Sequence, residues 1–134
     1  MFKIAIIGGG LGGLFAALSI HQHLTSENIQ VDVYEQAPEY KEIGAGVGIG
    51  PNAAALAVKL GLQEKLAKIT EFLQVLIDTV KERAAATLHT NKHCKSLEDQ
   101  GETVLLTFAD GTTTSANLVI GADGIHSATR KHYV

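Results

Sequence analysis

The chain is 134 residues long, and its 11 lysines and arginines against 14 aspartates and glutamates leave a formal net charge of −3. This length predicts a single domain, residues 1–134, with a core of its own and little room for a second binding domain. Basic residues do not cluster with aromatic ones, which argues against a nucleic-acid partner. The single cysteine, Cys94, excludes an internal disulfide and a cysteine-based metal cage.

The most apolar stretch, residues 4–20, contains five glycines and has no polybasic flank or cleavage signal. Neither a signal peptide nor a membrane span is therefore expected, and a cytoplasmic protein is predicted. Two histidine pairs, His21 with His23 and His89 with His93, lack further ligands at metal-binding spacing. No metal site is expected, and no catalytic residue is predicted.

The first predicted elements are a strand, a glycine-rich turn, a helix and a second strand. Residues 4–7 are apolar, residues 8–13 hold five glycines, and apolar residues then recur at helical spacing. The second strand, residues 31–34, ends at Glu35. The glycines follow the pattern Gly-x-Gly-x-x-Gly, and this order with an acid after the second strand is typical of a dinucleotide-binding unit.

Each glycine of the pattern has its own predicted role. Gly8 makes the tight turn, Gly10 admits a pyrophosphate close to the backbone, and Gly13 lets helix and strand pack closely. Leu11 and Gly12 begin the helix, whose free N–H groups and dipole favour phosphate charges. These five residues are the candidate phosphate-binding residues. The alternative is a strand-to-helix turn that binds no ligand.

Glu35 is predicted to accept hydrogen bonds from the ribose hydroxyls of the adenosine, and Gln36 beside it belongs to the same candidate site. A carboxylate here would repel a 2′-phosphate, so FAD or NAD is favoured over NADP. Without the glycines, a carboxylate at the end of a strand would be interpreted as a solvated surface residue.

The middle of the chain is predicted to be a loop followed by helices. Residues 44–50 hold four glycines, and Pro51 or Asn52 then begins a helix that continues to residue 60, with Gly61 as its C-cap. Apolar residues at helical spacing continue from there to about Arg83, which predicts one long helix.

The last third is predicted to be mainly β-structure. A hairpin turn is expected at Asp110 and Gly111, and residues 118–120 are expected to form a buried strand. The remaining strands are expected at residues 87–91, 92–97, 104–109 and 112–115. The predicted fold is a three-layer, Rossmann-like α/β domain with a parallel sheet and an antiparallel β-meander.

Three segments in this order resemble the flavin-dependent aromatic hydroxylases, most closely the salicylate hydroxylase type. They are residues 6–13 with Glu35, residues 44–53, and residues 121–130. The resemblance implies the FAD-binding domain of a monooxygenase, which is an oxidoreductase that uses NAD(P)H. By resemblance, residues 8–13 and Glu35 hold the ADP half of FAD.

The resemblance also implies roles for two later pairs. Gly46 and Val47 would approach the ribityl chain and the flavin ring. Asp123 and Gly124 match a motif that serves FAD and the nicotinamide cofactor. The physical alternative for Asp123 and Gly124 is an ordinary turn at the end of a strand.

The chain also departs from the family pattern. Family members are much longer, and residues 69–71 replace a crossing β-segment and an arginine expected near the FAD phosphates. We therefore expect a shortened natural or engineered FAD-binding domain without efficient hydroxylation and without a substrate domain. Two alternatives are an NAD-binding module and a cofactor-free structural domain. The second would associate with itself, as a homo-oligomer, through exposed apolar surface.

Overall fold

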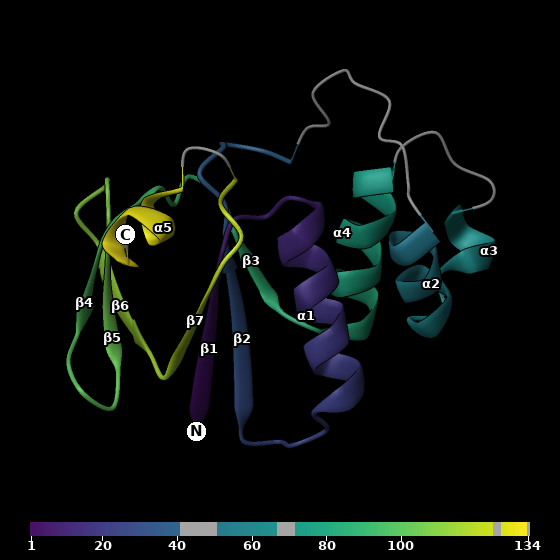
Figure 1. The fold of residues 1–134 in the computed structure, drawn as a ribbon, viewed down its shortest axis with the longest axis horizontal. Coiled ribbons are helices and arrows are strands. Elements are labelled where there is room, and N and C mark those ends of the chain that lie inside the picture. Colours follow the sequence, from purple (N-terminus) through teal and green to yellow (C-terminus); the bar gives the residue numbers. More distant parts are fainter. Residues whose placement is uncertain (41–50, 67–71, 125–126, 134) are drawn as a thin grey trace.

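The computed structural model describes residues 1–40, 51–66, 72–124 and 127–133. Two sheets organise them (Figure 1). The first sheet is parallel, and its strand order is β3-β2-β1-β7. Its strands are β1 (Phe2–Ile7), β2 (Ile29–Tyr34), β3 (Thr87–His89) and β7 (Leu118–Gly121). The second sheet is an antiparallel meander of β4 (Cys94–Asp99), β5 (Val104–Phe108) and β6 (Thr113–Ala116).

The described helices complete the layers. Helices α1 and α4 lie on one side of the parallel sheet, and the meander with α5 lies on the other (Figure 1). This arrangement confirms the predicted three-layer α/β fold with a parallel sheet and a β-meander. The helices are α1 (Leu11–His23), α2 (Pro51–Lys59), α3 (Gln63–Leu66), α4 (Phe72–Arg83) and α5 (Ala128–Tyr133).

The alternation of side chains along β1 builds two cores. Ile4 and Ile6 belong to the core under α1 and α4, whereas Ala5 and Ile7 belong to the core under the meander. Successive side chains of a strand point to opposite faces, so a central strand with helices on one side and a sheet on the other is apolar throughout. The carboxyl end of β1, and the glycine turn after it, lie at the upper edge of the sheet in the view of Figure 1.

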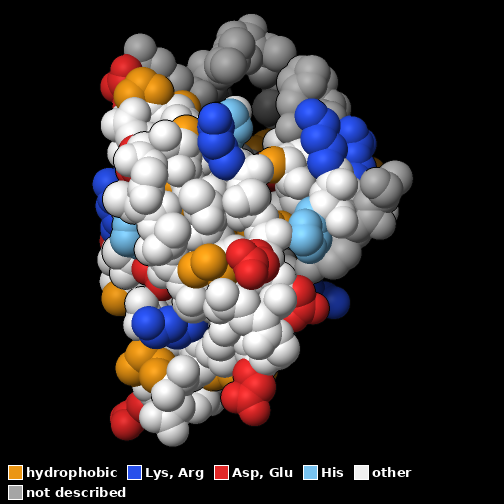
Figure 2. Space-filling model, turned by 90° about the vertical axis from the view of Figure 1, so that its left-hand side faces the viewer, with side chains coloured by type: hydrophobic (Ala, Val, Ile, Leu, Met, Phe, Trp, Pro, Cys, Tyr) orange, Lys and Arg blue, Asp and Glu red, His pale blue; other side chains and the backbone are white. Residues whose placement is uncertain are grey.

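The outer face of the molecule beyond the meander carries charges of both signs. Figure 2 shows lysine, arginine, aspartate and glutamate side chains scattered over this face, not gathered by sign. No helix among the described residues is long and apolar enough to cross a membrane.

The predicted end of α2 at Gly61 is confirmed. Gly61 has φ +71°, its N–H donates to Val58 O at 3.0 Å, and the Leu62 N–H donates to Ala57 O at 2.9 Å. These are the two hydrogen bonds of a Schellman cap, which places glycine at the left-handed position. The predicted continuous helix to Arg83 crosses residues 67–71, which lie outside the described residues.

Strand β7 corrects one expectation. It was expected to be a buried strand, but Leu118 is 45% exposed and Phe2 on the neighbouring strand is 47% exposed. Among the described strands, β7 pairs with β1 alone and forms the edge of the sheet. An apolar run of this kind predicts a parallel strand, but its position in the sheet decides how much of it is covered.

Helix α4 ends in the same cap as α2 but with alanine at the left-handed position. Ala84 has φ +51°, and the Ala85 N–H donates to Val80 O at 3.0 Å. Because an L-residue is strained at this φ and glycine is not, Ala84→Gly is expected to raise the free energy of unfolding by about 0.5–1 kcal/mol. Urea unfolding of the free chain measures this change. Ala16→Gly, in the interior of α1, is the control and should be destabilising; a loss of stability in Ala84→Gly would contradict the prediction.

Candidate cofactor-binding site

A cavity of about 260 Å³ lies at the carboxyl ends of β1, β2 and β7. Parallel α/β sheets bind ligands at this edge, because the turns that leave the strands converge there. The cavity is smaller than the 300–1,000 Å³ typical for whole ligands, so it can take only part of a dinucleotide. Its lining residues are Ile7, Gly8, Gly10, Tyr34, Glu35, Gln36, Lys92, His93, Cys94, Ala122, Asp123, Gly124 and Ala128.

The glycine turn between β1 and α1 is built by close backbone contacts. Gly8 has φ +108°, and a Cβ atom added to it would lie 2.1 Å from Ala122 O. A Cβ atom on Gly13 would lie 1.9 Å from Gly8 O. The predicted roles of Gly8 in the tight turn and of Gly13 in close packing are therefore confirmed.

Gly10 differs from these two glycines, because none of the described residues beyond its chain neighbours has an atom within 4 Å of a Cβ atom built on it. It is the N-cap of α1, no side chain of the described residues caps the helix there, and the first turn contains no acidic residue. The first N–H groups of a helix have no partner within the helix and attract anions. The space beside Gly10, at the start of a 13-residue helix, therefore suits the close approach of a phosphate.

Glu35 lies directly after β2 and is tied to the glycine turn. The Gly9 N–H donates to Glu35 Oε2 at 2.8 Å, and the Ala37 N–H donates to Glu35 Oε1 at 3.1 Å. A carboxylate has about four acceptor positions, so each oxygen can accept a further hydrogen bond. The carboxylate thus holds the turn and can still accept hydrogen bonds from ribose hydroxyls.

Tyr40 packs beneath the same turn. A Cβ atom on Gly9 would lie 2.6 Å from Tyr40 Cε1, and the Tyr40 hydroxyl is buried without a hydrogen-bond partner among the described residues. Burial, and secondarily the nearby Glu35 carboxylate, raises the pKa of Tyr40 to about 12. The phenol therefore stays neutral and is an unused donor close to the candidate site.

Asp123 lines the cavity, but its carboxylate is bonded to the start of α5. Oδ1 accepts a hydrogen bond from Thr129 Oγ1 at 2.7 Å and one from the Ser127 hydroxyl. Oδ2 accepts the N–H groups of Ala128 at 2.9 Å and Thr129 at 3.2 Å. Burial alone would raise the pKa of Asp123, but these hydrogen bonds outweigh it and lower the pKa. In this structure the carboxylate is thus a helix cap.

The structure brings six of the predicted site residues together around the cavity: Gly8, Gly10, Glu35, Gln36, Asp123 and Gly124. Leu11 packs against the core, Gly13 is buried, and Gly12 lies beside open space at the start of α1. None of these three lines the cavity. Gly46 and Val47 lie outside the described residues.

Sequence reasoning missed the wall of the cavity formed by Lys92, His93 and Cys94. These residues follow β3, the parallel neighbour of β2, and their position after a strand of that sheet was the available signal. Lys92 is the only lysine or arginine among the lining residues that the structure describes. Burial, and then Asp123, raises the pKa of the Cys94 thiol, so this cysteine stays protonated.

The fold and the cavity are those of a dinucleotide-binding α/β domain. A family model described as FAD binding domain matches residues 61–133. The chain therefore belongs to this FAD-binding domain family. The predicted resemblance to flavin-dependent monooxygenases of the salicylate hydroxylase type is confirmed by the relatives that follow.

Known relatives match almost the whole chain. A 6-methylsalicylate 1-monooxygenase of Aspergillus terreus is 35% identical over 176 residues, covering 97% of this chain and 39% of the relative. A salicylate hydroxylase of Pseudomonas putida is 31% identical, covering 97% and 38%. The crystal structure of Klebsiella pneumoniae HpxO complexed with FAD and uric acid is 25% identical with a TM-score of 0.73, covering 98% and 41%.

The chain thus spans about two fifths of the length of these relatives. The aligned stretch of 176 residues in the fungal relative is also longer than the 134 residues of the chain. The relative therefore has residues inside the aligned region that this chain lacks. This agrees with the predicted internal shortening, although the predicted place, residues 69–71, lies outside the described residues.

Proposed function

We propose that this chain binds FAD as the cofactor-binding domain of a flavin-dependent aromatic monooxygenase. The observation that carries the proposal is the start of α1 at Gly10, which no side chain in the described part of the chain caps, beside the cavity that Glu35 also lines. Family membership supports FAD, because the matching family is described as an FAD binding domain. The solved relative from Klebsiella pneumoniae was crystallised with FAD.

Each part of the cofactor has a proposed partner in the chain. The N–H groups at the start of α1 would hold the pyrophosphate, and Glu35 would hold the ribose of the adenosine. Gly46 and Val47 would approach the flavin, as the family resemblance implies. Bound FAD supplies the redox chemistry, and the protein supplies binding, orientation and electrostatics.

The finer parts of the proposal concern activity. NAD(P)H is proposed as the reductant, with Asp123 and Gly124 near the place where it would act. The chain is proposed to bind FAD without efficient hydroxylation, because the fungal monooxygenase has residues inside the aligned region that this chain lacks. A cytoplasmic location and a small-molecule dinucleotide partner complete the proposal.

The ribose contact gives the proposal a direct test. Glu35→Ala removes a charged acceptor of hydrogen bonds, so we expect FAD binding to weaken by about 1–3 kcal/mol, or roughly five- to 150-fold in Kd. Titration of the cofactor-free chain with FAD, followed by flavin fluorescence, measures the change.

Glu27→Ala is the matched control for this variant. It removes the same charge at the opposite end of β2, at an exposed position that does not line the cavity. Its affinity for FAD should equal that of the wild-type chain. An unchanged affinity in Glu35→Ala would refute the assignment of Glu35, and NAD binding more tightly than FAD would favour an NAD-binding module instead.

Self-association is the second candidate, and the exposed Phe2 and Leu118 favour it. Both lie on the paired strands β1 and β7, where Ile4 is the register partner of Leu118. Sedimentation velocity on the wild-type chain and on Leu118→Gln separates the two candidates. A folded oligomer that binds no FAD and dissociates in Leu118→Gln would support a structural domain.

A further inference from the structure

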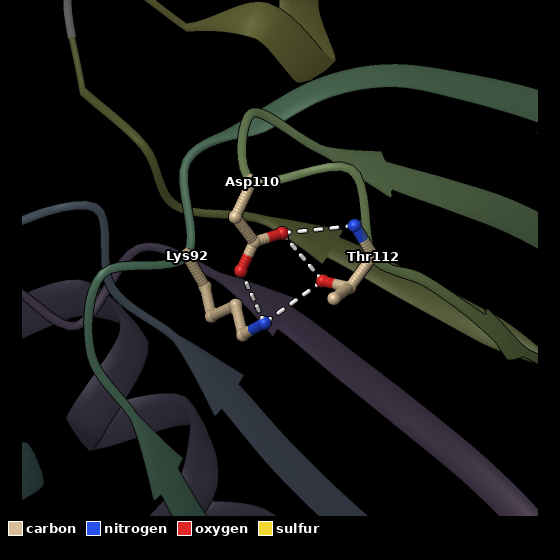
Figure 3. A network of polar contacts seen from close by, with 3 residues as sticks. All are labelled: Lys92, Asp110 and Thr112. Atoms are coloured by element: carbon tan, nitrogen blue, oxygen red, sulfur yellow. Dashed lines mark hydrogen bonds and ion pairs between the residues drawn. The ribbon is translucent and has the colours of Figure 1, made fainter.

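A polar network connects the turn between β5 and β6 to the wall of the cavity (Figure 3). The Lys92 ammonium donates to Asp110 Oδ2 at 2.6 Å and to Thr112 Oγ1 at 2.8 Å. Asp110 Oδ1 in turn accepts the Thr112 N–H at 2.9 Å and the Thr112 hydroxyl at 2.6 Å. Lys92 also lies 5.5 Å from the centre of the Phe108 ring, at the end of β5. Three contacts, to Asp110, Thr112 and the Phe108 ring, therefore hold the ammonium group against this turn.

The backbone around Lys92 is bonded on its other side to the residues that carry the candidate ribose site. The Lys92 N–H donates to Glu35 O at 2.9 Å, and the Asn91 N–H donates to Ala37 O at 3.0 Å. The carbonyl of His93 accepts the Ala109 N–H at 2.8 Å. Residues 91–93 thus form a bridge from the meander turn to residues 35–37.

Asp110 is the anionic partner of Lys92 in this bridge. The hydrogen bond from Lys92, followed by those from Thr112, holds the pKa of the Asp110 carboxyl well below its usual range. The carboxylate therefore stays ionised over the whole range in which the domain would work. An exposed ion pair is weak when isolated, but one shared with a turn and an aromatic ring is geometrically restrained.

We propose that Asp110 and Lys92 are positioning residues for cofactor binding. They hold the cavity wall, residues 92–94, and the segment 35–37 in the arrangement that binds the cofactor. The inference rests on the proposed function, FAD binding, and assigns a role to a residue that does not line the cavity. If the wall is competent only part of the time, the apparent Kd rises by the inverse of that fraction. A loosened bridge therefore weakens binding without removing any contact to the cofactor.

Asp99 provides a matched control in the same meander. Its Oδ1 accepts the Gly101 N–H at 2.8 Å, two residues ahead, as Asp110 Oδ1 accepts the Thr112 N–H. Asp99 lies at the end of β4, in the turn before β5, whereas Asp110 lies in the turn after β5. Asp99→Asn thus removes the same charge from the same kind of turn as Asp110→Asn does. It does so at the end of β5 that lies away from the cavity.

The experiment compares Asp110→Asn, Lys92→Met, Lys92→Arg and Asp99→Asn in the full chain by FAD titration, thermal unfolding and amide hydrogen exchange. Asp110→Asn and Lys92→Met are expected to raise the Kd for FAD about three- to fivefold and to speed exchange of the Lys92 N–H. Lys92→Arg keeps the cation, so its Kd for FAD should stay within about twofold of the wild-type value. Asp99→Asn should leave the Kd unchanged, even where its unfolding temperature falls as much as that of Asp110→Asn.

Two outcomes would overturn the inference alone: wild-type affinity in Asp110→Asn, or an equal loss of affinity in Asp99→Asn. Failure of the folded wild-type chain to bind FAD would overturn the proposed function, and this inference with it.

Discussion

Replacing Gly13 by alanine is expected to lower the free energy of unfolding by about 3 kcal/mol or more. The added methyl carbon would lie 1.9 Å from Gly8 O and 3.1 Å from Gly8 C. Both are backbone atoms of the turn, so no side-chain rotation can relieve the overlap. Helix α1 would have to move away from the turn, and the core that Leu14 and Leu18 form with β1 would open. Urea unfolding of the free chain measures the loss.

The adjacent Gly12→Ala is the control for this experiment. Gly12 lies in the same first turn of α1, and outside that helix no atom of residues 1–40, 51–66, 72–124 and 127–133 lies within 4 Å of a Cβ atom built on it. Because alanine is the better helix former, Gly12→Ala should be neutral or stabilising by up to about 1 kcal/mol. A similar stability for both variants would contradict the close packing at Gly13.

Gly10→Val, unlike Gly13→Ala, should have little effect on folding and a large effect on FAD binding. Gly10 has φ −79° and ψ −168°, an extended conformation that valine adopts, and with respect to the described residues the side chain would enter open space. The loss of a favoured N-cap residue costs about 1 kcal/mol or less. The same open space is where the pyrophosphate would approach, so the affinity for FAD should fall at least about a hundredfold, or about 3 kcal/mol.

Two measurements check the Gly10 prediction together. Flavin fluorescence titration gives the Kd, and urea unfolding shows whether the variant is folded. Gly10→Ala, with a smaller side chain, should lose less affinity than Gly10→Val. Wild-type affinity in a folded Gly10→Val chain would place the pyrophosphate elsewhere and remove the main support for the proposed function.

Local patterns in the sequence predicted much of the fold. The glycine turn, α1, β2 and the end of α2 each depend on backbone geometry or on the period of apolar residues within a few positions. Gly61 shows the principle, because its φ of +71° is a local requirement that glycine meets best. The hairpin at Asp110 and Gly111 was predictable for the same reason, and Gly111 has φ +86°.

Only part of the candidate site could be predicted from the sequence. Gly8, Gly10 and Glu35 belong to a motif whose spacing encodes their meeting at one edge of the sheet. Lys92 and His93 belong to no motif, and they reach the cavity because β3 pairs with β2. The sequence also predicted Asp123 at the site, but it did not show that the Asp123 carboxylate accepts hydrogen bonds from the first residues of α5.

The sequence by itself thus determined the β-α-β unit, its glycine turn and the membership of a dinucleotide-binding class, because these depend on short-range geometry and spacing. The tertiary structure alone decided which wall closes the cavity, which contacts Glu35 already makes, and that β7 is a half-exposed edge strand. Contacts such as those of Lys92 with Asp110 and with Thr112 join residues that are 18 and 20 positions apart. They form because two sheets and a helix pack together, and no local pattern records that packing.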